Sequence, residues 1–257
     1  MITQKSNALT SHLADDFETQ LERCNAYILG QLQARKRPSS VHGVPPPGPA
    51  ITISYQTGSG AHEIAQRMAE LLQSAEPKGS VPWTVFDRHL VEKALEDHNW
   101  PKTLAKFMPE DRRSLIQDVM EELVGLRPPS WVMVPQIAQT VLHLADAGHV
   151  ILVGRGANFI TARMPDVFHV RLIASLPGRI ERMRKLNHLT KAEAAALLKK
   201  EDRARGRYVK THFHVSVDND LLYHLVVNTD RIPCMDTARL IADGARRCFQ
   251  SDAGSKK

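Results

Sequence analysis

Residues 51–69 read Ile51-Thr-Ile-Ser-Tyr-Gln-Thr-Gly-Ser-Gly-Ala-His-Glu-Ile-Ala-Gln-Arg-Met-Ala69, which predicts a buried strand, a turn of small residues and an amphipathic helix. Such a turn exposes successive backbone N–H groups at a helix N-terminus, where hydrogen bonds and the helix dipole both stabilise a phosphate. The lysine of the motif G-x-x-x-x-G-K-[ST] is absent, because its position falls on Ala61. A tight turn without a ligand therefore remains open from this segment alone. The candidate phosphate-binding residues are Gly58, Ser59, Gly60, Ala61, His62 and Glu63.

Outward from this segment, apolar β-branched runs alternate with helical patterns. The expected strands are 50–55, 83–86, 150–153, 167–173 and 222–227, and the expected helices are 61–73, 88–97, 109–125, 131–147, 177–186, 191–205 and 235–249. Strands that are apolar on both faces and separated by helices are typical of a parallel sheet between helix layers. We therefore predict a three-layer α/β fold with a central parallel sheet of about five strands, whose ligands bind at the carboxyl ends of the strands.

Two segments precede this domain. Residues 8–35 carry one apolar stripe at spacings of three and four, which predicts a long helix and makes 1–35 an N-terminal helical extension. Residues 36–49, rich in proline and small residues, are expected to form a stiff linker. The main domain spans 50–250, and 251–257 is expected to be a disordered tail.

Composition limits the class of protein. With 257 residues, 42% of them hydrophobic and 24% charged, the chain can bury a core, and no apolar run is long enough to cross a bilayer. The polar N-terminus lacks the features of a secretory signal, and three scattered cysteines form neither a disulfide framework nor a CxxC site, so we expect a cytoplasmic protein. His212 and His214 lack suitable neighbours, and no protein metal site is predicted.

The positive charge is concentrated in one part of the chain. The formal net charge is +6, while residues 163–210 alone hold 13 basic and five acidic residues, which indicates an anionic partner. Within this block, Arg179 and Arg182 precede the run 201–210, where Gly206 favours a junction between helix and loop whose cations fold over a ligand. Arg155 follows the third strand between two glycines, which suits contact with a phosphate or a base edge. A solvated basic helix and an ordinary loop are the alternatives.

Six segments together resemble a known family. In chain order they are ITISYQTGSGAHEIAQRMAE, VFDRHLVEKAL, HVILVGRGANFI, HVRLIASLPGRIERM, EDRARGRYVK and LYHLVVNTDRI. This ordered set, over about residues 50–248, resembles the cytidylate-kinase-like family, which is similar to bacterial cytidylate kinases among the P-loop nucleoside monophosphate kinases. The resemblance implies a P-loop NTPase-type core, ATP and Mg²⁺ as ligands, and a lid that carries arginines.

The resemblance also implies roles for individual residues. The turn 58–63 would hold the donor phosphates, and Asp87 would face the acceptor or a magnesium-bound water. Arg155 would contact the acceptor, and Asp202 would orient an arginine. The residues implied for the transferring phosphate are Arg182, Arg203 and Arg207.

Three functions are compatible with these patterns. The first is an ATP-dependent phosphotransferase that moves the γ-phosphoryl group to a nucleoside monophosphate or another small phosphate acceptor. The second is a catalytically weakened nucleotide-binding module, suggested by Ala61 and His62, that acts through its N-terminal helix by pairing with its copy or docking on a partner. A nucleic-acid binder ranks third, because aromatic residues make up only 5% of the chain and none alternate with the arginines.

Overall fold

Five parallel strands form the sheet at the centre of the computed structural model, which describes residues 19, 22–24, 26–31, 48–87, 90, 114, 116–121, 134–154 and 156–254. The strands are β1 (Ala50–Tyr55), β2 (Thr84–Phe86), β3 (Val150–Val153), β4 (Val167–Ile173) and β5 (Leu225–Asn228). Their order across the sheet is β2-β3-β1-β4-β5. This arrangement confirms the predicted α/β class, and it places β1 in the middle of the sheet.

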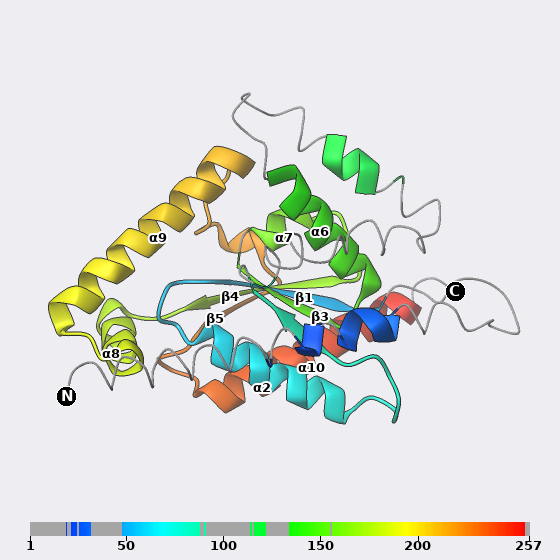
Figure 1. The fold of residues 1–257 in the computed structure, drawn as a ribbon, viewed down its shortest axis with the longest axis horizontal. Helices are drawn as coiled ribbons and strands as arrows, with labels where there is room; N and C mark the ends of the chain where they lie inside the picture. The colour runs from blue at the N-terminus through cyan, green and yellow to red at the C-terminus, as the bar shows by residue number, and fades with distance from the viewer. Residues whose placement is uncertain are drawn as a thin grey trace, which may run out of the picture.

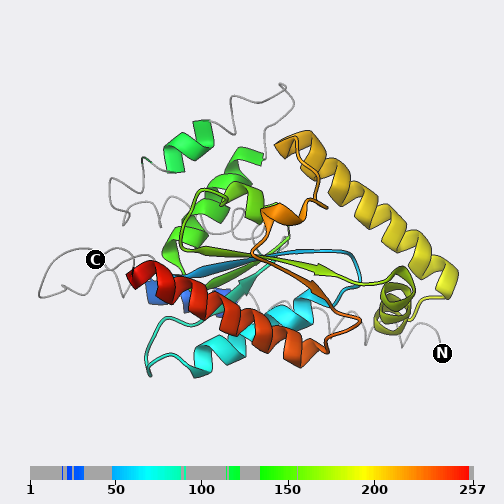
Figure 2. The ribbon, with the colours of Figure 1, turned by 180° about the vertical axis from the view of Figure 1, so that it is seen from behind.

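Helices cover both faces of the sheet (Figure 1, Figure 2). On one face lie α2 (Ala61–Ser74) and α10 (Cys234–Gly254), and on the other lie α6 (Val134–Ala147) and the short α7 (Ala157–Ile160). The pair α8 (Leu176–Asn187) and α9 (Lys191–Phe213) extends beyond the edge of this sandwich, as Figure 1 shows. The three layers predicted from the alternating pattern are therefore present.

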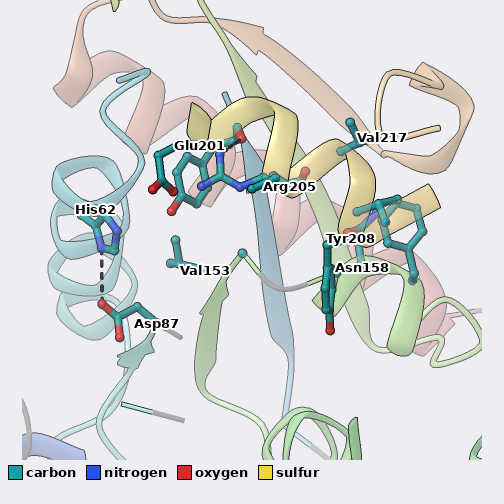
Figure 3. A pocket seen from close by; sticks show the side chains of 15 residues that line it. His62, Asp87, Val153, Asn158, Glu201, Arg205, Tyr208 and Val217 are labelled. Atoms are coloured by element: carbon teal, nitrogen blue, oxygen red, sulfur yellow. Dashed lines mark hydrogen bonds and ion pairs between the residues drawn. The ribbon is translucent and has the colours of Figure 1, made fainter. Parts of the chain in front are cut away.

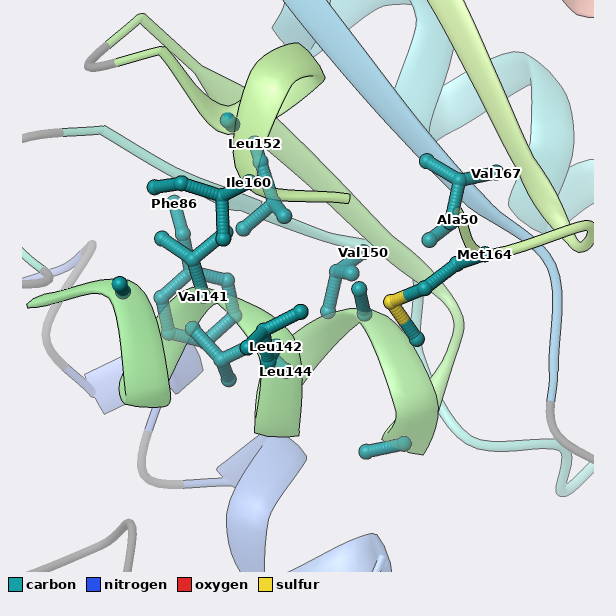
Figure 4. Packing of buried hydrophobic residues seen from close by; sticks show 14 of the residues in the cluster. Ala50, Phe86, Val141, Leu142, Leu144, Val150, Leu152, Ile160, Met164 and Val167 are labelled. Atoms are coloured by element: carbon teal, nitrogen blue, oxygen red, sulfur yellow. The ribbon is translucent and has the colours of Figure 1, made fainter. Parts of the chain in front are cut away.

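Each face of the sheet packs against its own apolar cluster. On the α6 side, Val141, Leu142 and Leu144 meet Leu152 of β3 and Ile160 of α7 (Figure 4). All of these side chains are at most 2% exposed. Full burial of one such side chain contributes about 1.5–3 kcal/mol. These contacts make the sheet a rigid base for the loops at its carboxyl edge.

The largest departure from the expected elements concerns α9. We expected Gly206 to end this helix, and that prediction is wrong, because α9 continues to Phe213. Ala194, Leu198 and Val209 are buried along its inner side at helical spacings, and a capping box at Thr190 fixes its start. Packing on both sides of Gly206 outweighs the roughly 1 kcal/mol that a glycine costs inside a helix.

Other element boundaries differ less. β5 begins at Leu225 rather than at 222, because a 3-10 turn, η1 (Asp220–Leu222), precedes it. The helix α10 continues to Gly254, into the stretch expected to be a tail. Of the helices expected at 88–97 and 109–125, the described residues 90, 114 and 116–121 are helical, and the rest lie outside the described residues.

The described part of the N-terminal extension packs against the main domain. Cys24, Tyr27 and Ile28 are buried in the cluster that also holds α6. The hydroxyl of Tyr27 donates to the backbone oxygen of Gly148 over 2.5 Å. The remaining stripe positions lie outside the described residues, and docking of this helix on a partner stays a prediction. No helix among the described residues is long and apolar enough to cross a membrane.

Candidate functional site

The turn between β1 and α2 has the backbone that a phosphate-binding loop requires. Gly58 and Gly60 have φ angles of 83° and 87°, in the left-handed region that favours glycine. The N–H of Ile64 donates to the oxygen of Gly60, so the first N–H groups of α2 have no partner within the helix. Ser59 is fully buried, and its hydroxyl has no hydrogen-bond partner among the described residues. The turn therefore presents unpaired donors where a phosphate would bind.

Three arginines of α8 and α9 reach the carbonyl oxygens of this turn. Arg182 donates to the oxygen of Gly58 over 2.5 Å, and Arg179 to that of Thr57 over 3.2 Å. Arg205 donates to the oxygen of Tyr55 over 2.9 Å, and its guanidinium lies 4.1 Å from the centre of the Tyr55 ring. These contacts bring positive charge to a turn that lacks the usual lysine.

Asp202 connects two of these arginines to the turn. Its carboxylate accepts hydrogen bonds from the N–H of Thr57 over 2.9 Å and from Arg179 over 2.5 Å, and it lies 3.8 Å from Arg205. Burial alone would raise the pKa of the Asp202 carboxyl, but the hydrogen bonds from Thr57 and Arg179 outweigh burial and lower it. The expected orienting contact of Asp202 with an arginine is present.

The predicted arginines do not gather at one place. Arg182 lies against the turn, whereas Arg203 and Arg207 are exposed on α9, and their contact with a transferring phosphate stays a prediction. Arg205, which is not among the predicted site residues, donates to Tyr55 and to the Thr57 hydroxyl of the turn. On a continuous helix, Asp202, Arg205 and Tyr208 share one side at spacings of three. The sequence prediction ended this helix at 205, so the three-residue spacing that continues to Tyr208 was not expected.

A cavity of about 210 Å³ lies beside the turn, at the carboxyl ends of β1 and β3 and beneath α9 (Figure 3). Its polar lining includes residues from four elements or loops: His62, Asp87, Asn158, Glu201, Arg205 and Tyr208. Nδ1 of His62 lies 3.8 Å from a carboxylate oxygen of Asp87, and the other oxygen of Asp87 accepts from the N–H of Leu90. This cavity is smaller than the roughly 300–1,000 Å³ of most ligand pockets, but like them it combines apolar walls with a few polar groups.

Arg155 lies outside the described residues. Its neighbours Gly154 and Gly156 line the cavity, with φ angles of 86° and 70°. A Cβ at Gly156 would lie 2.6 Å from the Phe213 ring, so glycine is required there. The contact of Arg155 with an acceptor stays a prediction.

Comparison with known proteins gives one family and distant similarities to solved structures. Residues 50–231 match the Cytidylate kinase-like family. No curated protein matches the chain. An uncharacterized protein from Eubacterium ventriosum ATCC 27560 shares 17% identity with a TM-score of 0.48, over 79% of this chain and 98% of that one. APE1195 shares 16% identity with a TM-score of 0.40, over 79% of this chain and 97% of that one.

Proposed function

The chain belongs to the cytidylate kinase-like family, and we propose that it is an ATP-dependent phosphotransferase that moves the γ-phosphoryl group to a nucleoside monophosphate or another small phosphate acceptor. The observation that supports this proposal most is the convergence of Arg179, Arg182 and Arg205 on a glycine turn that borders a polar cavity. Phosphoryl transfer depends mainly on positioning and on charge stabilisation. Both are available where the turn and the cavity meet.

The turn fits the phosphates of a bound nucleotide. The buried hydroxyl of Ser59 and the first N–H groups of α2 would donate to the donor phosphates, and Arg182 would supply positive charge in place of the missing lysine. Magnesium, when bound with ATP, neutralises negative charge on the donor phosphates. We assign Asp87 to a water of that ion or to the acceptor, because its carboxylate lines the cavity next to His62.

The acceptor would occupy the cavity with its phosphate toward the turn. His62 belongs to the first turn of α2 and also lines the cavity, so the two halves of the site meet at this residue. Arg205 donates to the oxygen of Tyr55 and also lines the cavity. It would stabilise negative charge between the donor and acceptor phosphates. The cover formed by α9 would exclude water from the reacting groups.

A nucleotide-binding module with little turnover is the second candidate. Ala61 supplies no charge at the lysine position, and each of the three arginines already donates to a backbone oxygen. If these contacts persist with a nucleotide bound, the arginines would stabilise the turn rather than the transferring group. ATP affinity without turnover would favour this candidate.

The deciding experiment measures both properties on the full chain. Purified protein is incubated with ATP and Mg²⁺ together with CMP, dCMP, UMP or AMP, and ADP formation is followed while ATP binding is titrated by calorimetry. We expect ADP to form with at least one acceptor. The rate of ADP formation should fall in Arg182→Met prepared in the same way, because a contaminating kinase would be equally active in both preparations. Binding of ATP with no acceptor-dependent ADP would contradict the proposed transferase and favour the second candidate.

A further inference from the structure

Asn158 is a buried residue whose side-chain nitrogen has no hydrogen-bond partner in the part of the chain that the structure describes. Its residue is 4% exposed, and the side-chain nitrogen of its carboxamide makes no hydrogen bond there. A buried amide without a partner is unfavourable, and such groups are rare in native proteins. The residue therefore needs an explanation other than stability.

The local fold does not require an asparagine at this position. Asn158 lies in α7, where the N–H groups of Ile160 and Thr161 are paired with the oxygens of Gly156 and Ala157. Its neighbours Ala157 and Ile160 are buried in the apolar cluster, so an apolar side chain would suit the surroundings. Asparagine is also a poor helix former. Packing and helix formation would both favour a different residue.

The position of Asn158 in the cavity indicates what it contacts. It lines the cavity beside the phosphate turn. In Figure 3, His62 and Asp87 lie on one side of this cavity, while Asn158 and Tyr208 lie on the other. A molecule whose phosphate lies near His62 would thus place its far end at Asn158.

We propose that the carboxamide of Asn158 is the specificity-determining contact of the acceptor, and that it hydrogen-bonds the polar edge of a ring at the end remote from the reacting phosphate. This inference rests on the proposed function. A carboxamide offers one donor group and one acceptor group side by side, which complements an edge that carries a carbonyl oxygen or ring nitrogen next to an amino or N–H group. Acceptors with such an edge, as nucleobases have, are preferred over acceptors that lack it.

The experiment combines stability with selectivity in the variants Asn158→Leu and Asn158→Asp. Leucine has nearly the shape of asparagine and removes the unpaired amide, so the melting temperature of the ligand-free protein stays the same or rises. Because the acceptor edge then loses its partner, kcat/KM for the preferred acceptor among CMP, UMP, AMP and GMP falls on the order of 10- to 100-fold. The KM for ATP stays within about twofold of wild type. Asn158→Asp shifts preference toward acceptors that present an amino group.

Asn187→Leu is the matched control. Asn187 is exposed in the last turn of α8, and its side chain donates to the oxygen and sulfur of Met183 in its own helix. Its replacement leaves the acceptor ratios unchanged.

Several outcomes overturn the inference. If wild type phosphorylates an acceptor and both Asn158 variants keep its acceptor ratios, the inference fails while the proposed function stands. A lower melting temperature of Asn158→Leu with unchanged selectivity in Asn158→Asp assigns the residue a structural role, for example through a buried water. If wild type turns over no acceptor, calorimetric binding of the same monophosphates decides: weaker binding by Asn158→Leu supports the contact, and equal or absent binding overturns it.

Discussion

The carboxylate of Asp202 accepts the backbone N–H of Thr57 over 2.9 Å, and this bond joins α9 to the turn that follows β1. The guanidinium of Arg179 completes the arrangement, since it donates both to Asp202 and to the oxygen of Thr57. Both backbone groups of Thr57 are thus held by one ion pair whose members come from α8 and α9. The geometry of the turn that follows β1 consequently depends on a helix far away in sequence.

Asp202→Asn should therefore loosen the turn and destabilise the protein. The amide keeps the shape but loses the charge opposite Arg179, and we expect a loss of about 1–3 kcal/mol in the free energy of unfolding together with weaker ATP binding. Urea denaturation and an ATP titration measure the two effects. Asp243→Asn, which alters an exposed pair with Arg246, is the control and should stay within about 0.5 kcal/mol. Equal stability and equal ATP binding of the two variants would show that the hydrogen bonds to Thr57 do not hold the turn.

The contrast between Arg182 and Arg203 gives a second prediction. Arg182 contacts the turn, whereas Arg203 is exposed on the outer side of α9. Arg182→Met should lower kcat/KM on the order of a hundredfold, as removal of a single stabilising donor does elsewhere, while Arg203→Met should change it by less than about threefold. Steady-state kinetics with the preferred acceptor measure both. A larger loss in Arg203→Met would mean that α9 rotates or closes during turnover.

The sheet and the turn were predictable from sequence because their signals are local. Residues 50–55 are apolar throughout most of their length, and the glycines at 58 and 60 occur where the backbone must take positive φ. Such features depend on neighbouring residues only. The same reasoning located the strands near 150 and 167.

The content of the site was harder to predict because it depends on packing between distant elements. The choice of Arg203 and Arg207 over Arg205 followed from an assumed break at Gly206, and only the burial of Val209 shows that the helix continues. Asn158 carried no sequence signal at all. Its significance appears only from its burial together with a side-chain nitrogen that has no partner among the described residues.

Two glycine substitutions test this account of α9 and the turn. Gly206 sits inside α9, and a Cβ added there would meet no atom of the described residues within 4 Å, so Gly206→Ala should raise stability by up to about 1 kcal/mol. Gly58 has a φ of +83°, and a Cβ there would lie 2.9 Å from the oxygen of Arg179. Gly58→Ala should therefore lower stability by about 1–3 kcal/mol. Thermal denaturation measures both, and destabilisation by Gly206→Ala would argue against a continuous helix.

His169 predicts a pH dependence of stability. Burial, and to a lesser extent the neighbouring His224, lowers the pKa of His169 from 6.5 to about 4. The unfolded chain binds a proton at this residue below pH 6.5 and the folded protein does so only near pH 4, so stability is full above 6.5 and declines toward pH 4. The contribution is on the order of 3 kcal/mol.

His169→Gln should flatten this part of the profile, measured by urea denaturation between pH 4 and 7. The exposed His188, replaced by asparagine, is the control that should retain the wild-type slope. An unchanged slope in His169→Gln would show that other groups cause the acid dependence.

The N-terminal helix gives the last prediction, because its described part behaves as a component of the core. Tyr27 is fully buried, its ring packs edge-on against Phe86 at 5.6 Å, and Gln31 donates to the oxygen of Ala147 over 2.8 Å. Tyr27→Ala should cost about 3–5 kcal/mol in the free energy of unfolding. Tyr27→Phe, which removes the hydroxyl that donates to Gly148 and accepts from Gln31, should cost about 1–2 kcal/mol. Leu29, which is 59% exposed, should tolerate alanine within about 0.5 kcal/mol. Guanidinium denaturation gives the free energy of unfolding of all three variants. If Tyr27→Ala retained wild-type stability, the helix would be free to leave the domain and engage a partner, and the second candidate function would gain support.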